Sequence, residues 1–132
     1  MKAVTVVLAF SLLCAGCSKT PTQPSIAPPT TTDVFSGTLQ PLGTNFHQFT
    51  VSQAGDVDTT LTSAGPPSTI TLGLGVGPFT NGVCSVQDGV STRAGLTPQL
   101  LDAAGPGEYC VTVADVGNLS APVDYTVTVT HP

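Results

Sequence analysis

The chain has 132 residues and a formal net charge of −5, and only 8% of its residues are charged. This length suffices for one modest domain and not for two. The basic residues Lys2, Lys19 and Arg93 are isolated from one another, and an acidic surface repels phosphate backbones. The composition therefore predicts no nucleic-acid partner.

Fourteen glycines and twelve prolines, together with many Thr, Ser and Val residues and a single Glu, make poor material for helices. The same residues suit short strands joined by tight turns. We therefore expect a protein built of β-structure.

The first residues have the pattern of an export signal. Lys2 gives a cationic start, and residues 3–13 form an uncharged, mostly apolar run. This run is too short to span a bilayer but has the length of a signal-peptide core. The small residues Ala15 and Gly16 then precede Cys17.

This arrangement resembles the lipobox of bacterial lipoprotein signal peptides, although Cys14 stands where that family usually has Leu. The resemblance implies that residues 1–16 are removed and that Cys17 is lipidated, so that a lipid anchor attaches the protein to a membrane. Ser18 after the cysteine implies the outer membrane where the host has one, and otherwise the cell membrane. The alternative is an ordinary signal peptide cut near Ala15, with Cys17 an incidental thiol.

The segment after Cys17 is predicted to be a stalk. Residues 18–32 contain four prolines and many threonines and show no apolar period. Such a sequence remains extended and disordered. We therefore divide the chain into a signal peptide (1–16), a lipidated cysteine with its stalk (17–32) and a folded domain (33–132).

From residue 33 onward the apolar period is two, which predicts an all-β fold, an antiparallel β-sandwich of about seven or eight short strands. In the clearest strand, 69–77, Ile70, Leu72, Leu74 and Val76 share one face, and the other face is nearly all glycine. That glycine face permits close approach of a ligand backbone or of a neighbouring loop. The predicted strands, in chain order, are 34–40, 46–52, 56–63, 69–77, 82–87, an irregular 97–103, 108–115 and 124–130.

Two cysteines, Cys84 and Cys110, lie inside the domain. In an exported protein such a pair is expected to form a disulfide. The alternatives are two free thiols or a metal-binding pair. The second has little support, because there is no CxxC spacing and neither histidine lies near either cysteine in the sequence.

The order of these segments resembles the bacterial pre-peptidase C-terminal domain, a β-sandwich often appended to secreted peptidases. In two places the chain departs from that family: His47 replaces an aromatic residue, and Ser68-Thr69 stand where calcium-binding relatives often carry acids. The resemblance implies a non-catalytic domain that assists targeting, secretion or substrate contact. It rests on FSGTL (35–39), FHQFTVSQAGDVDTTL (46–61), ITLGLGV (70–76), GPGEYCVTV (105–113) and DYTVTV (124–129).

Few residues suggest chemistry. His47 lies on the inward face of a predicted strand, where we expect a packed side chain bonded to a carbonyl. Asp56 and Asp58 share a strand face and are weak calcium candidates, although a solvated pair is the simpler interpretation. The carboxylates that folding could bring to them are Asp88, Asp102, Asp115 and Asp124.

No GxSxG or other local catalytic signature is present, so we expect neither an enzyme nor a cofactor. A glycan platform is disfavoured, because the chain has no Trp and both Tyr residues fall on inward positions. The leading interpretation is a membrane-anchored binding or adhesion module for a protein or cell-surface ligand. The alternative is a structural or accessory envelope lipoprotein that docks to a secretion, peptidase or assembly complex.

Overall fold

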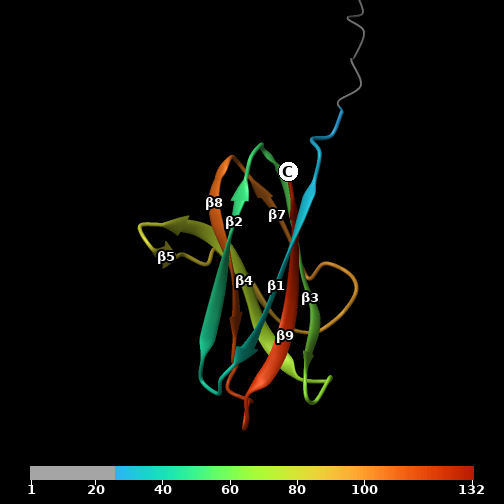
Figure 1. Cartoon of the computed structure of the whole chain (residues 1–132), viewed down its shortest axis with the longest axis vertical. Coiled ribbons are helices and arrows are strands. Elements are labelled where there is room, and N and C mark those ends of the chain that lie inside the picture. The colour runs from blue at the N-terminus through green and yellow to red at the C-terminus, as the bar shows by residue number, and fades with distance from the viewer. Residues whose placement is uncertain (1–25) are drawn as a thin grey trace, which may run out of the picture.

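The computed structural model describes residues 26–132, which form nine antiparallel strands in two packed sheets and contain no helix (Figure 1). The first sheet holds, in spatial order, β1 (Thr31–Leu39), β9 (Val123–His131), β3 (Gly55–Gly65) and β7 (Leu100–Ala104). The second holds β2 (Thr44–Val51), β8 (Gly107–Ala114) and β4 (Thr71–Thr80), and both β5 (Val83–Cys84) and β6 (Asp88–Arg93) pair with β4. The predicted all-β sandwich is confirmed.

The core lies between the two sheets and is built from the inward residues of alternating strands. The predicted faces are confirmed: Leu72, Leu74 and Val76 of β4 point inward, and so do the alternate residues of β8 and β9. Removing such side chains from water is the main stabilising contribution, about 1.5–3 kcal/mol for each large one. The core includes Leu39, Phe49, Val51, Val57, Leu61, Leu72, Leu74, Val76, Val111, Val113, Tyr125, Val127 and Val129.

Most strand bounds shift by a few residues from the prediction, and three differences are larger or bear on the site. The first strand begins at Thr31, so two residues assigned to the stalk pair with the end of β9. The predicted strand 82–87 shortens to β5, and residues 85–87 turn aside. The sixth strand was not predicted at all. It lies at a sheet edge with almost every residue exposed, so its sequence shows no alternation.

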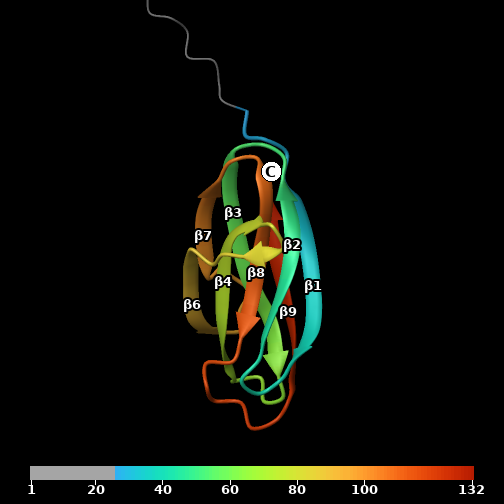
Figure 2. The ribbon, with the colours of Figure 1, turned by 90° about the vertical axis from the view of Figure 1, so that its left-hand side faces the viewer.

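The sandwich has two open edges, seen on opposite sides of Figure 2. One edge lies between β1 and β2, and the other lies between β6 and β7. The start of β1 pairs with the end of β9, so the N-terminal segment and the C-terminus emerge at the same end of the molecule (Figure 1). The turns 40–43, 66–70 and 115–122 lie at the opposite end.

Candidate functional site

The glycine face of β4 is covered by the segment that follows β5. A Cβ added at Gly75 would lie 2.8 Å from the Val86 side chain, and one added at Gly77 would overlap the Ser85 carbonyl oxygen. The backbone N–H of Gln87 also donates to the carbonyl of Val76 at 2.9 Å. Of the two predicted uses of the glycine face, the structure shows the neighbouring loop.

A disulfide fastens this covering segment to the sheet. It joins Cys84 to the fully buried Cys110, with their Cα atoms 5.8 Å apart. The chain reaches this position through a two-residue hairpin turn at Asn81-Gly82, where both residues have the positive φ (52° and 79°) that such turns require. The pairing agrees with the expectation from the cysteine count. Its buried position on β8 is that of a structural disulfide.

Beside the disulfide lies an exposed apolar surface, which we call the outer apolar surface and define as Phe46, Phe79, Val83 and Val86. The Phe46 and Phe79 rings stack with centroids 5.7 Å apart. The exposed fractions of Phe46, Val83 and Val86 are 47%, 59% and 49%. Sequence reasoning missed this surface, although Phe46 stands in the outward phase of the predicted strand 46–52.

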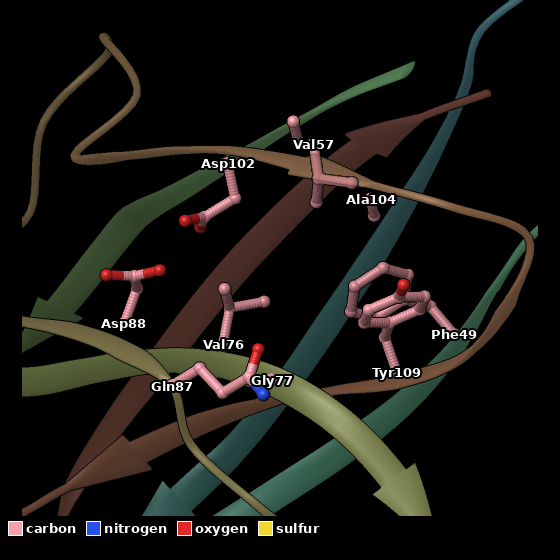
Figure 3. A pocket seen from close by; sticks show the side chains of 10 residues that line it. Phe49, Val57, Val76, Gly77, Gln87, Asp88, Asp102, Ala104 and Tyr109 are labelled. Carbon is pink, nitrogen blue, oxygen red and sulfur yellow. The ribbon is translucent and has the colours of Figure 1, made fainter. Parts of the chain in front are cut away.

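A small cavity of about 50 Å³ opens between the sheets near β6 and β7 (Figure 3). Its walls are mostly apolar, and the Phe49 and Tyr109 rings stack with centroids 5.8 Å apart. Asp88 and Asp102 face one another across it, one from each sheet. A space of this size holds a few water molecules.

Burial raises the pKa of the Asp102 carboxyl, and the nearby Asp88 carboxyl raises it further. The Oδ2 atom of Asp102 is buried without a hydrogen-bond partner. The only Lys or Arg among residues 26–132 is Arg93, which lies at the far end of β6 and pairs with Thr71. The two carboxyls therefore meet without a neutralising side chain.

At the opposite open edge, His47 packs among aromatic and polar side chains. Its ring stacks on Phe35 with centroids 4.9 Å apart, and its Nε2 lies 2.8 Å from the Tyr125 hydroxyl in a hydrogen bond. The Asn45 amide donates to the same hydroxyl at 3.1 Å. Burial lowers the pKa of His47, which favours the neutral ring. The expectation of a packed histidine holds, but its partner is a hydroxyl and not a carbonyl.

Asp56 and Asp58 lie on the outer face of β3, opposite Ala103 and Leu101 of β7. Within residues 26–132 no group of three or more His, Cys, Asp or Glu side chains could hold a metal ion. Among the described residues the structure therefore brings no third ligand of these types to the two calcium candidates.

The other carboxylates are engaged elsewhere. Asp115 accepts backbone N–H groups from Leu42 and from its own turn, at 2.8–3.2 Å. Asp124 accepts the Thr38 hydroxyl at 2.6 Å. His131 Nε2 lies 3.1 Å from Asp33 Oδ2, within hydrogen-bond distance. These contacts fasten turns and strand ends.

No protein-family model matches the chain, and a search of curated proteins finds no match. The resemblance to the pre-peptidase C-terminal domain therefore stays a prediction. Cys17, the signal peptide and most of the stalk lie outside the described residues. Between residues 26 and 132 there is no helix with the length and apolarity needed to cross a membrane.

Proposed function

We propose that this chain is an exported, lipid-anchored envelope protein whose β-sandwich is a non-catalytic binding module. The observation that carries the proposal is the Cys84–Cys110 disulfide. Disulfides persist in oxidising compartments and are rare in reducing ones. The bond thus supports the export signal inferred from the apolar run before Cys17.

The outer apolar surface supports the binding part of the proposal. Exposed aromatic side chains gathered with aliphatic ones are typical of surfaces that contact other proteins. The tyrosines that a glycan platform would use are turned inward, since Tyr125 is 2% exposed and Tyr109 lines the cavity. We therefore expect the ligand to be a protein at the cell surface, which the module binds and does not chemically modify.

The first experiment tests the anchor. The intact mass of the protein purified from its own membranes should equal residues 17–132 with acyl groups, less two hydrogens for the disulfide. Cys17→Ser should release the protein from the membrane fraction and leave its melting temperature unchanged. Retention of Cys17→Ser in the membrane, or an unacylated mass, would contradict the lipid anchor.

The second experiment tests binding. A photo-crosslinking residue at Val83 should give a discrete adduct on intact cells. The matched control is the same residue at Val34, which is 62% exposed on the other sheet. Equal adducts at both positions, or none at Val83, would contradict binding through the outer apolar surface. An adduct to a secretion or assembly component would favour the accessory-lipoprotein alternative.

A further inference from the structure

The carboxyl pair stands at the seam between the sheets. Asp88 is the first residue of β6, which pairs only with β4, and Asp102 is the middle residue of β7, which pairs only with β3. Each carboxyl is therefore carried by an outermost strand with hydrogen bonds on one side only. The two side chains point toward one another across the cavity (Figure 3).

The surroundings offer these carboxyls no positive charge. On β8, Tyr109 lines the cavity and Glu108 beside it is exposed. The elements packed around the cavity contribute these other titratable or charged groups: Asp56 and Asp58 on the outer face of β3, His131 of β9 against the Phe49 ring at 5.1 Å, and Arg93 at the far end of β6.

We propose that Asp88 and Asp102 form a proton-operated clasp at the β6–β7 edge. One proton shared by the two carboxyls holds the edge closed in mildly acidic solution. When that proton leaves to solvent, two facing carboxylates repel each other, the strands separate and water enters the cavity. Two carboxyl groups held close together commonly share one proton, because both cannot be ionised without strong repulsion.

The direction of the pKa shift agrees with this device. Burial, and then the neighbouring Asp88, raise the pKa of Asp102 above its ordinary value of 3.8. A carboxyl whose pKa is raised by folding binds its proton more tightly in the folded state. Its destabilising effect is absent below the ordinary value and grows as the pH rises through the folded value.

The linker between the strands limits the opening. Residues 94–99 are fastened to β3, because the N–H groups of Gly95 and Gln99 donate to the carbonyls of Leu61 and Thr59 at 2.9 and 3.0 Å. The Gln99 side chain also accepts the Leu61 N–H at 2.7 Å. We therefore expect β6 and β7 to separate only near Asp88 and Asp102. The linker 94–99 should stay attached to β3 at Thr59 and Leu61.

The first measurement is amide hydrogen exchange of the purified full chain at about pH 4 and about pH 7, with the rates corrected for the intrinsic effect of pH. The second is the pH dependence of the ¹³C chemical shifts of the Asp88 and Asp102 carboxyl carbons. We expect coupled titration of the pair, and protection of β6 and β7 about fivefold lower at the higher pH, with β9 unchanged. Asp88→Asn should remove this pH dependence. Asp56→Asn, which deletes an equal charge outside the cavity, should keep it.

Three results would overturn the clasp. The first is independent titration of Asp88 and Asp102 near the ordinary value. The second is an unaltered pH dependence of protection in Asp88→Asn. The third is protection at neutral pH that calcium restores and a chelator removes, because a cation and not a proton would then bridge the carboxyls. The carboxyl titration needs no variant and so does not depend on the folding of any mutant.

Discussion

The Asp115 carboxylate accepts hydrogen bonds from four backbone N–H groups, three of them in the turn that follows it. The hydrogen bond from the Leu42 N–H has the largest effect and lowers the pKa of Asp115; burial, the next largest, opposes it, and the N–H groups of Asn118, Gly117 and Leu119 lower the pKa further. A lowered carboxyl pKa stabilises the fold above the ordinary value of 3.8, and this stabilisation is lost as the pH falls through the folded value.

Asp115→Ala should therefore lower the melting temperature at neutral pH, and the difference from wild type should shrink below about pH 4. Thermal unfolding across this pH range measures the effect. Asp56→Ala, which removes an exposed carboxylate, serves as control and should change little. A deficit for Asp115→Ala that is constant with pH would mean that the turn does not depend on the ionised carboxylate.

Gly77 shows how one missing side chain positions a segment. A Cβ there would overlap the Ser85 carbonyl, whereas at Gly73, on the same face of β4, the nearest atom is 3.4 Å away. Gly77→Ala should lower the free energy of unfolding by about 1–3 kcal/mol, because backbone would have to move. Gly73→Ala is the matched control and should be nearly neutral. Urea unfolding distinguishes them, and equal effects would argue against close packing of residues 85–87.

At the scale of elements, the disulfide ties β5 to β8, an interior strand of the same sheet. It closes a separation of 26 residues. In the chain-entropy description, a loop of this length stabilises the fold by about 3–4 kcal/mol. Cys84→Ser should remove this stabilisation and leave membrane attachment intact. Ser85→Ala, one residue along and without a thiol, should change the melting temperature far less. An unchanged melting temperature for Cys84→Ser would contradict the bond.

The strands that bury one face were predictable because their apolar residues alternate with polar or small ones along the sequence. The alternation of β4, β8 and β9 gave their inward residues correctly. In β3 the alternation fails after Leu61, where a bulge shifts the register and buries Ala64 in place of Ser63. The sixth strand carried no such period because neither of its faces is deeply buried.

The candidate site was harder to predict, because its parts meet only in three dimensions. Asp88 and Asp102 come from different sheets, and no local spacing relates them. The glycine face was visible in the sequence, but residues 85–87, which cover part of it, were predicted to belong to the strand 82–87. The outer apolar surface combines Phe46 with residues more than thirty positions away, which only the sheet order brings together.

At the scale of the whole molecule, the core lies entirely within residues 31–132 of the described chain. A chain that begins at residue 26 keeps every residue of this core, so we expect it to melt within about 2 °C of a chain that begins at residue 17. Differential scanning calorimetry of the two species measures this. A clearly lower melting temperature for the shorter chain would show that earlier residues pack on the sandwich.

The N-terminal segment and the C-terminus lie at the same end of the sandwich, which fixes how the domain would be oriented on the proposed tether. A strand of nine residues spans about 30 Å, so the turn at Gly117 lies roughly that far beyond the point where the chain enters the fold. For the anchored protein proposed above, an epitope appended after Pro132 would lie at the end of the sandwich where the proposed stalk joins it. An epitope inserted at Gly117, where nothing lies within 4 Å of an added Cβ, faces outward. Antibody binding to the two labelled proteins would therefore report which end of the sandwich is accessible.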